Sequence, residues 1–183
     1  MSRPALLGLA LALPLTAAAS LTAAVLTAPA AHADERVCRG SIGASSIDGD
    51  VVVPRDATCR LNGTRVDGNV LVRDGATLVA RGVRVGGNVQ AEGHEKVVVR
   101  PRTVDDRVVR SAVGGSVQLK QGGGGLLLRT VVDSDIQLFS NDARFTVRRN
   151  AVDGNLQCKG NDPAPVGGGN AVQGEKENQC ADL

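Results

Sequence analysis

The sequence predicts an all-β fold, a single-stranded parallel β-helix (solenoid) of about six to seven coils with 19–20-residue repeats and disulfide-capped ends. Three observations predict it. A short turn motif returns at a nearly fixed period, strand-like stretches flank each copy, and the cysteines form two close pairs near opposite ends of the region after residue 33.

The turn motif consists of an apolar residue, a pair such as Asp-Gly or Gly-Gly, a small polar residue and a second apolar residue. Its copies begin at Ile47, Val66, Val85, Val113, Val132, Val152 and, in degraded form, Val172. Successive steps are therefore 19, 19, 28, 19, 20 and 20 residues. Self-similarity at such a period is typical of a solenoid in which each repeat forms one coil.

Each repeat contains two strand-like stretches. One follows the turn with apolar residues at alternate positions, as in 70–72 and 117–119, and a second precedes the next turn, as in 78–80 and 126–128. No segment of 34–183 shows sustained 3.6-residue periodicity with caps, so we expect no helix of consequence there. Stacked coils about 4.8 Å apart would form a rod roughly 30 Å long.

The small polar residue of each turn motif should stack on its counterparts in the neighbouring coils. This column consists of Asp50, Asn69, Asn88, Ser116, Asp135 and Asn155. Side chains of this kind bond to neighbouring backbone groups and to one another. Repetition in every coil indicates a structural turn ladder rather than a metal or catalytic site.

Residues 1–33 are typical of an export signal. Arg3 supplies a positive start, residues 5–29 form an apolar run rich in Ala and Leu, and Ala31-His32-Ala33 fits a signal-peptidase site. The predicted organisation is a signal peptide over 1–33 and a β-solenoid domain over 34–183. We expect a secreted protein without a membrane span after cleavage; a retained membrane helix is the alternative.

The four cysteines favour two disulfide bonds. Pairing Cys38 with Cys59 and Cys158 with Cys180 joins residues 21 and 22 positions apart. A zinc site would need closer cysteine spacing, or more histidines than His94 alone. Each loop should contribute about 3 kcal/mol and cap a solenoid end whose strand edges would otherwise be open, so we expect a monomer.

The 28-residue step carries about nine extra residues within 92–111, and insertions in solenoids form loops that often bind. The candidate binding loop consists of His94, Arg100, Arg102, Asp105, Asp106, Arg107 and Arg110. Guanidinium forks favour an anionic or polar partner. A solvated loop whose opposite charges neutralise each other is the alternative.

Composition excludes several function classes. A net charge of +2 with both signs scattered along the chain argues against an electrostatic nucleic-acid binder. The run Gly122–Gly125 lacks the Lys-Ser/Thr of a P-loop, and one histidine in 34–183 gives little support for a catalytic triad. We predict no catalytic residue, cofactor or metal.

The V-D-G-N-V repeats between Ile47 and Glu175 resemble parallel β-helix proteins, and more loosely the bactofilin type. That resemblance implies a structural scaffold, whereas pectate-lyase-like enzymes of the same architecture bind sugar in an acidic and Arg-bearing groove. The Ala-rich leader and the Val, Gly and Arg bias are similar to exported proteins of GC-rich actinobacteria.

Two functions remain in view. The first is a secreted, non-enzymatic structural or interaction module whose partner is a cell-envelope polymer or protein. The second is a small polysaccharide-acting lyase or hydrolase, against which the absence of Trp and Tyr counts, because sugar rings usually stack on these side chains. A small disulfide-bonded β-sandwich is the alternative fold.

Overall fold

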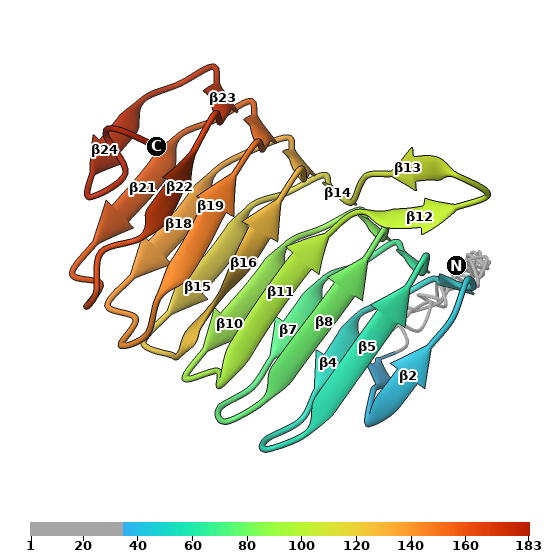
Figure 1. Ribbon diagram of the computed structural model, residues 1–183. Coiled ribbons are helices and arrows are strands. Elements are labelled where there is room, and N and C mark those ends of the chain that lie inside the picture. The colour runs from blue at the N-terminus through green and yellow to red at the C-terminus, as the bar shows by residue number, and fades with distance from the viewer. Residues whose placement is uncertain (1–34) are drawn as a thin grey trace, which may run out of the picture. The chain divides into compact units, whose positions relative to one another are not determined.

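Three sheets wind into a solenoid in which nearly every coil contributes one strand to each sheet (Figure 1). The computed structural model describes residues 35–183, and this part of the chain contains no helix. Strands of one sheet pair in parallel with the strands of the coils before and after. The expected all-β parallel solenoid is confirmed.

The strands are as follows. Sheet A contains β1 (Arg36–Val37), β4 (Val51–Val53), β7 (Val70–Val72), β10 (Val89–Glu92), β15 (Val117–Lys120), β18 (Ile136–Phe139), β21 (Leu156–Lys159) and β24 (Lys176–Asn178). Sheet B contains β2 (Gly40–Ile42), β5 (Thr58–Asn62), β8 (Thr77–Arg81), β11 (Lys96–Arg100), β16 (Gly124–Leu128), β19 (Phe145–Arg148) and β22 (Val166–Gly168). Sheet C contains β3 (Ser46–Ile47), β6 (Arg65–Val66), β9 (Arg84–Val85), β14 (Ala112–Val113), β17 (Val131–Val132), β20 (Ala151–Val152) and β23 (Ala171–Val172). A separate hairpin pairs β12 (Arg102–Val104) with β13 (Arg107–Val109).

Two details differ from the sequence prediction. Sheet A has eight strands within residues 35–183, so the solenoid has about eight turns rather than six to seven. The extra turn arises because β1 and β2 precede the first turn motif, at Ile47. Each repeat also has a third strand, since the leading apolar residue of the motif lies in sheet C. These strands are two residues long, too short to show alternation in sequence.

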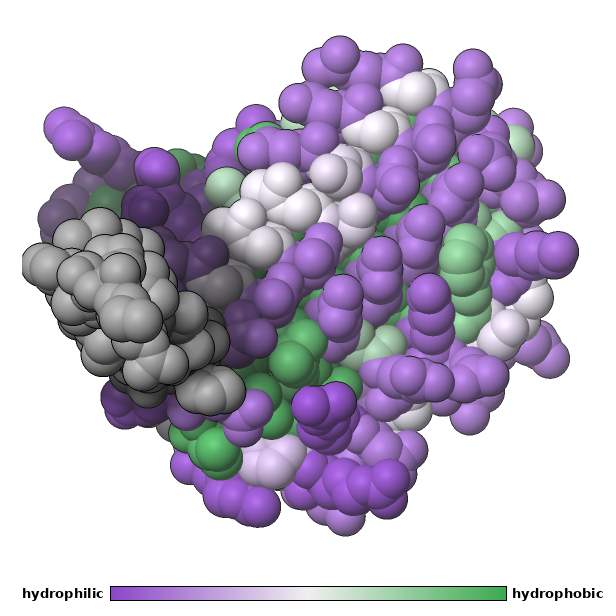
Figure 2. All heavy atoms as spheres, turned by 180° about the vertical axis from the view of Figure 1, so that it is seen from behind, coloured by the Kyte–Doolittle hydropathy of each residue, from purple (hydrophilic) through white to green (hydrophobic). Residues whose placement is uncertain are grey.

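The core is a set of aliphatic columns. In β7, Val70 and Val72 are buried while Leu71 faces outward, and the same alternation continues in β10 and β15. The register aligns Val70 with Val89 and Val89 with Val117, so like residues stack on like. This burial of aliphatic surface is the main stabilising contribution available to a chain with so few aromatic residues. Seen from behind (Figure 2), hydrophilic side chains form rows that run from coil to coil, the surface counterpart of this stacking.

The turn ladder joins successive coils from Asp50 to Glu175 at the corner between sheets C and A. Each ladder residue's side-chain oxygen accepts a hydrogen bond from the backbone N–H of its counterpart in the following coil. These bonds measure 2.7–3.3 Å, and their donors are Asn69, Asn88, Ser116, Asp135, Asn155 and Glu175. Most of these donors are partly buried, and a backbone donor withdrawn from water and left unpaired is costly, so the ladder fixes the register at this corner.

The ladder explains the glycine of the motif. A Cβ on Gly154 would lie within 3.0 Å of Asp135 Oδ1 and of the Ser134 carbonyl, although the backbone there has no positive φ. Gly68, Gly87, Gly115 and Gly174 face the preceding ladder oxygen in the same way. Where the ladder residue is Ser116, with a shorter side chain, the facing residue in the next coil is Ser134.

The two disulfides lie at the two ends of the described solenoid. Cys38, between β1 and β2, is bonded to Cys59 in β5, with 5.5 Å between their Cα atoms. Cys158 in β21 is bonded to Cys180 after β24, with a Cα separation of 5.3 Å. All four cysteines are buried. The pairing is the one that the spacing predicts, and each bond ties a terminal coil to its neighbour.

The insertion forms the β12–β13 hairpin at the corner between sheets B and C. Arg100 aligns with Arg81 and Ala112 with Arg84, so residues 101–111 replace the two residues 82–83 of the preceding coil. Asp105 and Asp106 turn the hairpin with φ values of 46° and 59°, a region in which Asp is enriched. Ser111 closes its base by donating to the Arg100 carbonyl (2.9 Å) and accepting from the Val83 N–H (3.3 Å).

The ladder makes a steric prediction. Gly154→Ala should lower the free energy of unfolding by about 1–3 kcal/mol, because the new methyl group overlaps Asp135 Oδ1 and a carbonyl. Ser134→Ala, at the same position of the preceding coil, should stay within about 0.5 kcal/mol. Urea unfolding of both variants measures the difference, and equal losses would contradict the steric explanation.

The hairpin should be removable without loss of the fold. Replacing residues 101–110 by one glycine restores the 19-residue coil and should change the free energy of unfolding by only about 1 kcal/mol, because loop length affects closure entropy weakly. Replacing 101–111 by one glycine removes one residue more, including Ser111, and should destabilise much further. Circular dichroism with thermal unfolding compares the two, and similar behaviour would show that the register argument is wrong.

Candidate binding surfaces

The candidate binding-loop residues occupy two separate corners. Arg102, Asp105, Asp106 and Arg107 lie in the hairpin, Arg100 ends β11, and Arg110 follows β13, where its Nε donates to the Arg129 carbonyl (3.1 Å). His94 lies instead between β10 and β11, at the corner between sheets A and B. Six of the seven predicted loop residues therefore lie together at the hairpin corner, and His94 lies at a different corner.

His94 is buried rather than on an exposed loop. It is 1 % exposed, its ring meets the Phe145 ring edge-on at 5.9 Å, and neither ring nitrogen has a hydrogen-bond partner among residues 35–183. Burial lowers the pKa of His94 from 6.5 to about 4, and the Asp142 carboxylate opposes this shift only in part. A neutral ring in apolar surroundings fits a packing role.

The two rings account for part of the glycine run 122–125. A Cβ on Gly122 would lie within 3.0 Å of the His94 ring and carbonyl, and one on Gly125 would lie within 3.0 Å of the Phe145 ring and the Val97 carbonyl. The run therefore makes room for the His94 side chain of the preceding coil and the Phe145 side chain of the following coil.

Buried asparagines form two further ladders that the sequence reasoning missed. Asn141 Nδ2 donates to Asn161 Oδ1 (2.9 Å) and to the Leu119 carbonyl (3.0 Å). Asn150 Nδ2 likewise donates to Asn170 Oδ1 (3.0 Å). The sequence signal was the 20-residue spacing within each pair, at the two corners that the turn motif does not occupy.

The outer face of sheet A carries a row of glutamines. Leu71, Gln90, Gln118, Gln137 and Gln157 align across β7, β10, β15, β18 and β21, and Glu177 follows in β24. Gln137 Nε2 donates to Gln157 Oε1 (3.1 Å), and Gln157 Nε2 donates to Glu177 Oε1 (3.0 Å). The side chains of Gln90 and Gln118 make no hydrogen bond with any residue of the described solenoid.

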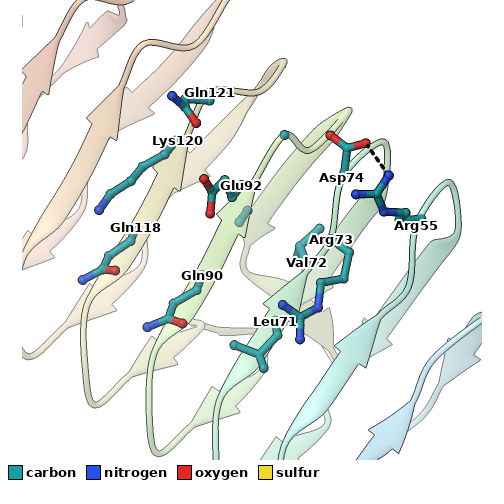
Figure 3. Close-up of a pocket in the computed structure, with 12 residues that line it drawn as sticks. Arg55, Leu71, Val72, Arg73, Asp74, Gln90, Glu92, Gln118, Lys120 and Gln121 are labelled. Carbon is teal, nitrogen blue, oxygen red and sulfur yellow. Dashed lines mark ion pairs between the residues drawn. The ribbon is translucent and has the colours of Figure 1, made fainter.

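Gln90 and Gln118 line an open groove of about 750 Å³ on this face (Figure 3). Glu92 and Lys120 stand beside them at the ends of the same strands, β10 and β15, and Arg73 follows the neighbouring strand β7. At the edge of the groove, Arg55 Nη1 and Asp74 Oδ2 form an ion pair of 3.4 Å between exposed side chains. The groove thus offers amide groups together with charges of both signs.

Comparisons place the chain in no known family. No protein-family model, curated protein or solved structure matches it. Within residues 35–183, no group of three or more His, Cys, Asp or Glu side chains could hold a metal ion. In the same region, no helix has the length and apolar character needed to cross a bilayer.

The buried histidine predicts a pH effect. An unfolded chain binds a proton at His94 below pH 6.5, whereas the folded chain binds one only near pH 4, so stability should fall as pH drops between these values. The loss attributable to His94 should reach about 3 kcal/mol. His94→Asn, which places asparagine in the column of Asn141 and Asn161, should abolish this component in urea unfolding from pH 7 to 4. An unchanged slope in the variant would contradict the assignment.

Proposed function

We propose that the protein is exported and acts without catalysis, as an interaction module that binds an extended polar polymer of the cell envelope in the sheet A groove. Two features support export: the leader-like sequence of residues 1–33, which lie outside the described part of the structure, and the two disulfides. Secretion fits a protein whose ends are held by covalent bonds.

The unpaired amides of Gln90 and Gln118 carry the proposal. Gln137 and Gln157 of the same row use their amides on each other and on Glu177, whereas those in the groove have no partner among the described residues. An amide offers two donors and an acceptor, which suits the hydroxyl groups of a polysaccharide. Neighbouring strands set these amides about 4.8 Å apart, so a chain crossing the coils meets them in succession.

A polysaccharide-acting enzyme is the second candidate, because two carboxylates line the same groove. Asp74 and Glu92 come from adjacent coils, with Arg55, Arg73 and Lys120 around them. Glycosidases use a pair of carboxylates across the scissile bond. Asp74, however, is already paired with Arg55.

Binding is tested with protein secreted from its own leader. Its mass should show that the chain begins at Asp34, as the leader prediction requires. Co-sedimentation with peptidoglycan sacculi and with insoluble polysaccharides should then show retention. Gln90→Ala/Gln118→Ala should weaken it at least about tenfold, and the matched pair Gln137→Ala/Gln157→Ala should change it less than about twofold, because those amides are already bonded.

Three outcomes would overturn the proposal: no retention on any polymer, equal losses in both glutamine pairs, or a protein that stays in the cytoplasm. Release of oligosaccharides from a retained polymer, abolished by Asp74→Asn and by Glu92→Gln, would establish the enzyme in its place.

A further inference from the structure

Three arginines gather at the corner between sheets B and C, away from the sheet A groove. Arg81 and Arg100 are direct register partners in β8 and β11. Both face outward, because the residue before each of them, Ala80 or Val99, is buried and side chains alternate along a strand. Arg102 begins the hairpin strand β12 two residues after Arg100. The hairpin therefore adds a third guanidinium to a pair that the solenoid already stacks.

The side chain of Arg102 lies along the corner. A Cβ on Gly82 would lie within 3.0 Å of Arg102 Cγ, and one on Gly63 would lie within 3.0 Å of its Cζ and Nη1. The aliphatic part thus covers Gly82 and the guanidinium reaches Gly63, one coil further back. Both glycines have positive φ, +57° and +67°, so these corner positions favour glycine on conformational grounds as well.

None of these three guanidiniums forms an ion pair with a carboxylate of the described solenoid. Its two ion pairs are Arg55–Asp74 and Arg65–Asp67, and neither involves this corner group. The Nε atoms of Arg81, Arg100 and Arg102 are buried without a hydrogen-bond partner, so only the terminal Nη groups can reach a ligand. Unpartnered buried donors and adjacent like charges both raise the free energy of this arrangement.

A bound anion would offset that cost. We propose that Arg81, Arg100 and Arg102 form a binding site for a phosphate group, contacted by their Nη atoms. Three guanidiniums match a tetrahedral oxyanion, whose acceptor oxygens point in several directions, better than they match a single planar carboxylate. The phosphate could be a free ion or a phosphodiester of an anionic polymer, and the two sources share this chemistry.

Calorimetry at constant ionic strength tests the site with two probes, inorganic phosphate and a poly(glycerol phosphate) oligomer. Both should bind. Arg102→Ala should weaken binding at least tenfold, and so should exchange of residues 101–110 for one glycine. Arg144→Ala removes the same charge from an exposed position just before β19, at the corner between sheets A and B and outside the groove, and should change binding less than twofold.

The probes distinguish the sources. Binding of the oligomer at least tenfold tighter per phosphate than inorganic phosphate supports a polymer ligand, and equal affinity supports the free ion. Absence of heat with both probes would overturn the site, and so would equal losses in Arg102→Ala and Arg144→Ala, which would indicate diffuse electrostatics. Arg100→Gln provides a second variant outside the hairpin, with the same expected loss.

Discussion

The hydrogen bond from one coil's ladder oxygen to the next coil's backbone is the constraint on which the rest of the structure depends. It holds successive coils at one fixed offset, from Asp50 through to the acceptor Asn155. Because the offset is fixed, residues at the same position of successive repeats stack in a column on the same face or corner of the solenoid. The aliphatic core, the glutamine row of sheet A and the stacked pair Arg81 and Arg100 all follow from this alignment, since each consists of register partners in successive coils.

The 19–20-residue period of the turn motif allowed much of this fold to be predicted from the sequence. The turn motif located the ladder, and the cysteine spacing located both disulfides. The sheet C strands stayed hidden because a pair such as Arg65–Val66 is too short to alternate. His94 was misplaced for a different reason: the insertion follows it so closely that it was grouped with the insertion. The register instead aligns His94 with Asn141 and Asn161, two and three coils further on, where the column holds asparagine rather than histidine.

Surface chemistry was less predictable than the fold, because it depends on which residues of neighbouring coils meet. A balanced net charge said nothing about the local balance at a corner. The Gln90 and Gln118 amides differ from those of Gln137 and Gln157 only in their contacts, which the sequence does not record. The two surfaces consequently suit different ligand chemistry, hydroxyl-rich at the groove and anionic at the hairpin corner.

The hairpin also shows that the stacking of the coils does not depend on the segment inserted at this corner. Eleven residues stand where the preceding coil has two, yet Ala112 resumes the alignment as though nothing had intervened. Segments of other lengths and sequences should therefore be tolerated at this corner, provided that their base is closed as Ser111 closes this one. The solenoid would then serve as a general carrier, in which the coils determine the folding and the inserted segment determines what this corner binds.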